Sequence, residues 1–407
     1  MISLPIRSMV LSLVCLLPLT AQSCFAQQFG APVVARVEMQ LKVGEETIDV
    51  IEKGDLLTVL KEEDDTYLIL THAGKQGMVS NVNALKLEES VEIYDELIKA
   101  TPDEGRFYTL RASAWWARGD EIAALGDFDQ AIESGYKQAH AYSSRGMFHA
   151  AIGNVEKAVA DYTEAISIDP KDESNFINRA AAYISQQKFE DAVADYGKAL
   201  ELKPKTSTYQ QRAVAWKMAG KPEMAVEDFT AALKINPDDI PSLMGRGFVS
   251  FQSGDQKKAI EDFSAVISIN PRAAEAWNNR GFNRQLLGDF EKALADYSEA
   301  TKLAPAYALA WVNMAWLQAT CKDEALRDGE KAADAARKAC ELTDFQDYNA
   351  LKALAAAFAE QGNFEKAIGW QEKALEHSPE TKKKDEEELL ELYRDEKPFR
   401  VADLSGR

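Results

Sequence analysis

The sequence predicts a mainly helical repeat protein that is preceded by a small all-β module. Prolines recur at steps of 34, 33, 34 and 34 residues, at Pro170, Pro204, Pro237, Pro271 and Pro305. A tandem period of this length indicates stacked helical units, and small side chains at two fixed positions of each repeat support that assignment. Residues 33–87 instead contain short runs rich in β-branched residues, punctuated by glycine and aspartate, as is typical of strands.

Residues 1–26 have the pattern of a cleavable secretory signal. Arg7 precedes an apolar run at residues 9–19, and Cys24 and Ala26 are the small residues that a cleavage site requires. The apolar run is too short to cross a bilayer, which takes about 20 residues, so we expect no transmembrane span in the mature chain. The pattern therefore predicts an exported protein, periplasmic or extracellular. A lipoprotein anchored through Cys24 and a buried N-terminal helix are the alternatives.

Residues 33–87 are predicted to form a small all-β barrel. The strings GDLLTVL at residues 54–60 and GKQGMV at residues 74–79 resemble the bacterial Src-homology-3 family. That resemblance implies a role in binding peptides or the cell wall. Thr66 and Met78 stand where the family usually has tryptophan, so a structural spacer is the alternative. We expect strands at residues 33–43, 47–51, 56–60, 67–71 and 77–82.

Residues 105–381 divide into eight repeats. Position 8 of each repeat is Ala or Gly and position 20 is always Ala, because two helices that cross closely need small side chains at their contact. Position 24 is aromatic in the first six repeats, and we expect it to fill the space against the following repeat. The seventh repeat carries additional residues within 321–330. The repeats span residues 105–138, 139–172, 173–205, 206–239, 240–273, 274–307, 308–347 and 348–381.

The repeat pattern resembles the tetratricopeptide repeat (TPR) family, as in WNNRGFNRQLLGDFEKALADYSEATKLAP at residues 277–305. The resemblance implies a solenoid of helical hairpins, wound as a right-handed superhelix, that binds other proteins. Residues 90–104 are expected to form a connecting helix, the second half of a truncated repeat with Tyr94 at the aromatic position. Residues 382–407 are expected to form a capping helix and tail.

Two charged positions occur together and disappear together along the repeats. Position 7 is Arg and position 23 is Asp in repeats one to six, and the last two repeats lack both. Pairing within a repeat uses every charge, whereas pairing each Asp with the next repeat's Arg would leave Arg111 and Asp296 alone. A row of arginines that binds anionic ligands is the alternative. The predicted structural ion pairs are Arg111–Asp127, Arg145–Asp161, Arg179–Asp195, Arg212–Asp228, Arg246–Asp262 and Arg280–Asp296.

In the TPR family the inner face of the solenoid is lined by first-helix positions such as 2, 5, 6, 9, 12 and 13. Here these positions carry amides, hydroxyls and aromatic rings, without a basic cluster. Asn178 and Asn279 match amides of the family's clamp for a C-terminal carboxylate, but the neighbouring cations are missing. We therefore expect an extended, weakly charged or basic peptide as partner. Core packing of the aromatic residues and simple solvation of the amides are the alternatives. The candidate groove residues are Ser144, Asn178, Gln211, Phe248, Asn279, Phe282, Asn313 and Trp316.

Charge and composition argue against several classes of function. A formal net charge of -19 repels nucleic acids. Zinc-type HExxH, phosphate-binding GxxxxGK[ST] and nucleophile-turn GxSxG motifs do not occur in the sequence, so we expect no catalysis, bound metal or cofactor. The run of glutamates at residues 386–388 is expected to lie on a solvated face. We expect Cys321 and Cys340 to be buried thiols rather than a disulfide.

These observations predict an exported protein-interaction scaffold or assembly factor that binds an extended peptide in the groove of its repeats. The alternative is a cell-envelope anchoring protein. In that case the β-barrel binds peptidoglycan and the repeats serve as a spacer or oligomerisation module.

Overall fold

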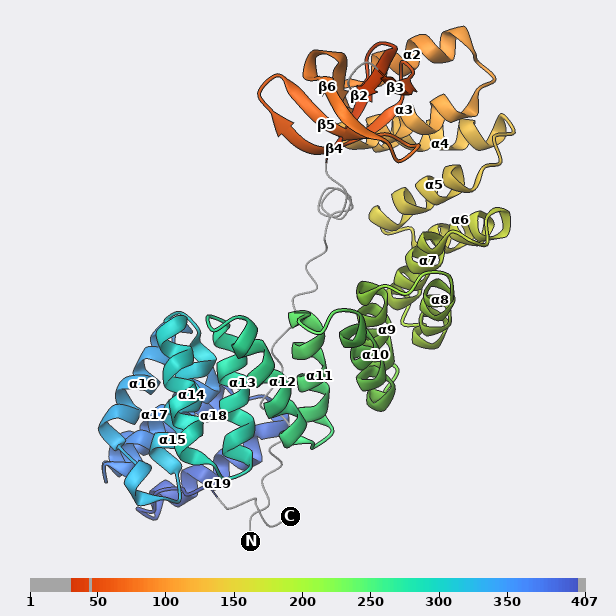
Figure 1. The fold of residues 1–407 in the computed structure, drawn as a ribbon. Helices are drawn as coiled ribbons and strands as arrows, with labels where there is room; N and C mark the ends of the chain where they lie inside the picture. The colour runs from red at the N-terminus through yellow and green to blue at the C-terminus, as the bar shows by residue number, and fades with distance from the viewer. Residues whose placement is uncertain (1–30, 44–45, 402–407) are drawn as a thin grey trace. The chain divides into compact units, whose positions relative to one another are not determined.

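The computed structural model describes residues 31–43 and 46–401, which form two compact units divided between Pro204 and Lys205 (Figure 1). The N-terminal unit comprises the described residues up to 204, and the C-terminal unit comprises residues 205–401. The secretory signal and the lipidation alternative at Cys24 lie outside the described residues. Each unit is mainly helical, apart from a small β module at the start of the N-terminal unit.

The β module contains more strands than the sequence indicated. A five-stranded sheet has the order β6-β5-β4-β1-β7, and β2 pairs with β3 in a separate hairpin. The expected first strand, residues 33–43, is two strands, because the chain bends after Ala35, whose backbone oxygen accepts a hydrogen bond from Gly54. Both halves bury apolar side chains, such as Val33 and Leu41, in one shared core. The strands are β1 (Pro32–Ala35), β2 (Met39–Val43), β3 (Glu46–Ile51), β4 (Leu56–Glu63), β5 (Thr66–Leu70), β6 (Gln76–Ser80) and β7 (Ala84–Lys86).

The β module is held against the first helices of the N-terminal unit. Helix α2 (Val91–Ala100) buries Tyr94 completely, and the Tyr94 hydroxyl donates a hydrogen bond to the backbone oxygen of Gly54 at 3.1 Å. Gly54 has a φ of 88°, and a side chain there would also collide with Leu97, so the turn requires glycine. Arg106 forms an ion pair with Asp55 at 2.7 Å. The β module thus covers the start of the repeat array, as terminal caps of solenoids do.

Eight helical hairpins follow, three in the N-terminal unit and five in the C-terminal unit (Figure 1). Aspartates begin several of the helices by accepting hydrogen bonds from backbone N–H groups, as Asp120 does from Ala123. The first helices are α3 (Gly105–Arg118), α5 (Ala139–Ala151), α7 (Glu173–Ser185), α9 (Thr206–Met218), α11 (Ile240–Gln252), α13 (Ala274–Leu286), α15 (Ala308–Thr320) and α17 (Tyr348–Glu360). The second helices are α4 (Glu121–Glu133), α6 (Val155–Ile168), α8 (Phe189–Leu202), α10 (Pro222–Ile235), α12 (Gln256–Ile269), α14 (Phe290–Leu303), α16 (Gly329–Leu342) and α18 (Phe364–His377).

The small-residue positions lie where the two helices of a hairpin touch. A side chain added at Gly146, position 8 of its repeat, would come within 2.9 Å of the Tyr162 ring. Tyr162 is the position-24 residue of the same repeat, and it also contacts Ala182 of the next one. The aromatic residue therefore packs within its own hairpin as well as against the following repeat.

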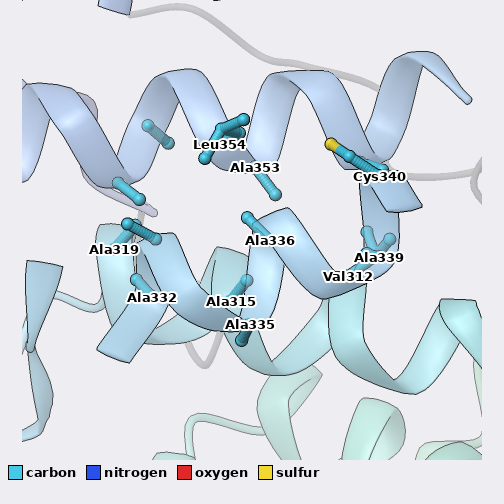
Figure 2. Packing of buried hydrophobic residues seen from close by; sticks show 14 of the residues in the cluster. Val312, Ala315, Ala319, Ala332, Ala335, Ala336, Ala339, Cys340, Ala353 and Leu354 are labelled. Carbon is cyan, nitrogen blue, oxygen red and sulfur yellow. The ribbon is translucent and has the colours of Figure 1, made fainter. Parts of the chain in front are cut away.

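The last two hairpins are held together by an alanine-rich core. Figure 2 shows Ala315, Ala332, Ala336 and Ala353 directed between closely packed helices of this region. Positions 7 and 23, charged in the earlier repeats, are here occupied by apolar residues that pack on this core. Those residues are Met314, Leu354, Ala335 and Trp370.

Helix α19 (Lys383–Arg394) packs on the last hairpin and buries Leu389, Leu390 and Tyr393. The expectation that the glutamates at residues 386–388 lie on a solvated face is wrong for Glu386, which is buried. Its carboxylate accepts a hydrogen bond from Lys352 at 3.0 Å and another from Gln371 at 2.8 Å. These two donors replace the water that the carboxylate loses.

Candidate functional site

The six Arg–Asp pairs share one geometry. In each pair the arginine lies on the first helix, and its Nε and Nη2 atoms donate to the two carboxylate oxygens of the aspartate on the second helix of the same repeat. The donor–acceptor distances run from 2.6 to 3.0 Å. Such two-point bonds hold both side chains in one orientation. The alternative of a free arginine row does not fit this arrangement.

A second acceptor, which the sequence analysis missed, lies at position 25 of the preceding repeat. The Nη1 atom of Arg145 donates to Asp129 at 2.8 Å, and that of Arg246 donates to Thr230 at 3.1 Å. The signal was present in the sequence, since this position mostly holds Asp, Thr or Ser. Each arginine with such an acceptor ties its own hairpin together and also binds the hairpin before it. The other bonds of this kind are Arg111–Asp95, Arg179–Thr163 and Arg280–Ser264.

The ion pairs are largely removed from water. The Arg179 and Asp195 side chains are 16% and 8% exposed, and the remaining pairs are similar. The hydrogen bond with Asp195 raises the pKa of Arg179 above its ordinary value, although burial opposes the shift. These twelve residues are therefore part of the structural framework that positions the candidate groove.

Four candidate groove residues lie together in the C-terminal unit. Phe248 of α11, Asn279 and Phe282 of α13, and Asn313 of α15 line one pocket. The Phe251 ring bridges two neighbouring first helices, because its centroid lies 6.3 Å from that of Phe248 and 5.6 Å from that of Phe282. The other residues lining the pocket are Phe263, Asn278, Asn283 and Leu309.

The amide side chains of this pocket differ in which of their polar atoms already form hydrogen bonds. Asn313 donates to the Asn278 side chain at 2.9 Å, and Asn278 donates in turn to Asn279 and Tyr307. Asn283 is only 2% exposed; its side-chain nitrogen donates to the backbone oxygen of Asn279. Its side-chain oxygen is buried without a hydrogen-bond donor in the described part of the chain. A buried acceptor of this kind takes its hydrogen bond from an ordered water or from a ligand group.

The other four candidates do not share this pocket. Ser144 and Asn178 are half-buried on α5 and α7 of the N-terminal unit, and Gln211 is exposed on α9. Trp316, on α15, packs against Phe399 with ring centroids 5.5 Å apart and a tilt of 36° between the ring planes. Trp316 is thus covered by a later segment of the chain itself.

The two cysteines of the seventh repeat are buried, free thiols in separate clusters. Cys321 directly follows the last residue of α15, and Cys340 lies near the end of α16. Burial raises the pKa of Cys340 to about 12 and also raises that of Cys321. Only the thiolate reacts readily with alkylating agents, and neither residue forms much of it near neutral pH.

We expect iodoacetamide at pH 8 to leave Cys321 and Cys340 unmodified in the folded chain and to modify both in urea. An Ile122→Cys variant supplies the control, because residue 122 is exposed and its thiol should react at once. Peptide mass mapping under non-reducing conditions reads out both results. Rapid labelling of the folded chain, or a linked Cys321–Cys340 peptide, would contradict this assignment.

Two features bear on metal binding and membrane crossing. Among the described residues, no group of three or more His, Cys, Asp or Glu side chains is placed to hold a metal ion. The described helices include none that is long and apolar enough to cross a membrane.

Burial lowers the pKa of His140 and of His149, both on α5, which favours their neutral form.

Family models of the tetratricopeptide repeat match residues 139–172, 176–205 and 274–307. Similar solved structures include YrrB, "a TPR protein with an unusual peptide-binding site", at 22% identity over 45% of this chain and 95% of that one, with a TM-score of 0.40. The C-terminal part of a TPR repeat-containing protein from Cytophaga hutchinsonii is 15% identical over 56% and 94% of the chains, with a TM-score of 0.49. A TPR protein from Parabacteroides merdae is 18% identical over 74% and 98%, with a TM-score of 0.41. None of the curated proteins matches this sequence. The chain contains TPR repeats, and its helices form a TPR-like solenoid.

Proposed function

We propose that this protein is an interaction scaffold that binds an extended peptide segment in the pocket between α11, α13 and α15. The observation that carries the proposal is the combination of an apolar wall with an unsatisfied acceptor. Phe248, Phe251 and Phe282 form the wall, and the buried side-chain oxygen of Asn283 is the acceptor. A peptide that places an apolar side chain on the rings and an N–H group on Asn283 satisfies both.

The lining of the pocket favours an uncharged partner segment. All nine residues that line the pocket are uncharged. Beside them, the Lys217 ammonium lies 5.2 Å from the Phe248 ring centroid, where the ring faces a cation. A second cation beside the rings would be repelled by Lys217, whereas an apolar or uncharged polar side chain would not. An acidic peptide gains no charge-assisted bond from the nine lining residues.

Selection from a random peptide library displayed on phage, with the full chain as bait, tests the proposal. We expect apolar and uncharged polar residues to be enriched. The selected peptides should lose at least about tenfold in affinity for Phe282→Ala and Asn279→Ala, because a few central residues dominate such interfaces. Fluorescence anisotropy with the labelled peptide measures the change.

Leu287→Ala is the matched control. Leu287 caps the same helix and is partly exposed, but it does not line the pocket. Its substitution should leave the affinity unchanged, and thermal melting should show that all variants are folded. Peptides that bind both pocket variants as tightly as the wild type would exclude the pocket as the binding site.

A second proposal is that the β module, as the resemblance to the Src-homology-3 family implies, binds peptidoglycan and anchors the protein in the cell envelope. It is supported by the strings GDLLTVL at residues 54–60 and GKQGMV at residues 74–79, which carry that resemblance. Sedimentation of the full chain with purified peptidoglycan distinguishes the two proposals. Both assume export through residues 1–26, which we propose from the sequence pattern.

A further inference from the structure

The chain turns back after α19 and lies against two first helices of the C-terminal unit. Glu396 has a φ of 58°, and the backbone N–H groups of Glu396 and Lys397 donate to Tyr393 and Leu392 at the end of the helix. Pro398 follows, and proline cannot continue a helix. Residues 395–401, which we call the return segment, therefore leave α19 and approach α15 and α17.

Three kinds of contact hold the return segment in place. The Phe399 ring packs against Trp316 in a tilted arrangement, with 36° between the ring planes, and joins a cluster that includes Ala355 and Tyr393. The Arg400 guanidinium forms an ion pair with Glu360 at 2.5 Å. The backbone N–H of Val401 donates to the backbone oxygen of Thr320 at 2.9 Å. Packing of an apolar side chain on a ring, a charge pair and a main-chain hydrogen bond are contacts by which extended peptides are recognised.

The surface under the return segment coincides with the expected inner face of the repeats. Trp316 stands at position 9 of the seventh repeat and Thr320 at position 13, and Glu360 stands at position 13 of the eighth. These are positions at which the TPR resemblance places partner contacts. The return segment therefore occupies a surface of the kind expected to bind a partner.

This surface is suited to an aromatic residue followed by a cation. The last carbonyl groups of α15 have no partner within the helix, and they carry the partial negative charge of a helix end. Glu360 adds a full negative charge beside them. Its carboxylate is oriented by Arg327 at 2.9 Å, a residue of the additional segment in the seventh repeat. That additional segment thus helps to build the site.

We infer that the return segment is a built-in ligand, which competes with partner peptides that carry an aromatic residue followed by arginine. This inference rests on the proposed function, since it assumes that the inner face binds peptides. It also defines a second binding subsite, at Trp316 and Glu360, which is separate from the pocket at Phe248 and Phe282. Because the segment is tethered by only a few residues, its effective concentration is in the millimolar range or above, and a free peptide must displace it.

The test uses the full chain and a labelled peptide with the sequence of residues 395–401, amidated at its C-terminus. We expect this peptide to bind the variant Phe399→Ala/Arg400→Ala at least about tenfold more tightly than the wild type, because the tethered competitor is weakened. Adding Glu360→Gln or Trp316→Ala to that variant should abolish the gain. Fluorescence anisotropy measures all four affinities.

Lys397→Ala is the matched control, because Lys397 is exposed in the same segment and contacts neither Trp316 nor Glu360 through any described interaction. It should behave as the wild type. The single variant Arg400→Ala, which keeps the Phe399 ring in its cluster, should shift affinity in the same direction if the double variant folds poorly. Equal affinity for wild type and variants, or no binding to a folded variant, would overturn the inference. Peptides that still depend on Asn279 and Phe282 would then show that the proposed function stands without it.

Discussion

Arg179→Leu is expected to lower the free energy of unfolding by about 3 to 5 kcal/mol, because it leaves the Asp195 carboxylate buried without its partner. Asp195→Leu should cost a similar amount for the converse reason. The double variant should lose less than the sum of the two, since no unpaired charge then remains. The expected coupling energy is about 2 kcal/mol or more. Urea denaturation followed by circular dichroism measures the three values.

An exposed pair on helix α8 of the same hairpin provides the control. Lys198 and Glu201 lie 2.8 Å apart, but their side chains are 59% and 67% exposed. Lys198→Ala should therefore change stability by no more than about 1 kcal/mol. A coupling energy near zero between Arg179 and Asp195 would mean that the two-point bond contributes nothing to the fold.

Phe128→Ala is the second substitution expected to have a large effect, with a loss of about 3 to 5 kcal/mol. The ring is 1% exposed and packs between Ala112 and Ala124 of its own hairpin and Phe148 of the next. The neighbouring alanines are too short to fill the space, and the helices are already at close approach. A cavity should therefore remain at the junction of two repeats.

Ile122→Ala on the same helix is its matched control. Ile122 is 88% exposed, so its truncation should change stability by no more than about 0.5 kcal/mol. Urea denaturation of both variants gives the comparison. If Phe128→Ala cost as little as Ile122→Ala, the hairpins would not depend on position 24 for their packing.

The helical hairpins could be predicted from local sequence because every repeat presents the same requirements at the same positions. Ala112 and Ala124, for example, recur as small residues throughout the array, and only a close helix crossing explains both columns. The ion pairs could also be predicted, since Arg at position 7 and Asp at position 23 occur together in six repeats and are both absent from the last two. Periodicity converts one weak local signal into eight independent observations.

The candidate site was less predictable, because the positions that line an inner face do not reveal which side chains there are already engaged. Asn313, a predicted groove residue, lines the pocket, and its side-chain nitrogen is already bonded to Asn278. The repeat pattern does not distinguish Asn283, whose side-chain oxygen is buried without a donor in the described part of the chain. Hydrogen bonds between neighbouring repeats depend on distances that a single repeat pattern does not contain.

The amino-acid order alone therefore specifies the class of fold, the length and number of the helical units and the charge pairs within them. These follow from short-range spacing along the chain, which is repeated many times. Three other features could be seen only in the tertiary structure, because they depend on long-range contacts that occur once. They are the division of residues 33–43 into two strands, the burial of Glu386 and the packing of the return segment on Trp316. A contact without a periodic counterpart leaves no pattern in the sequence, and it becomes visible when the folded chain brings its partners together.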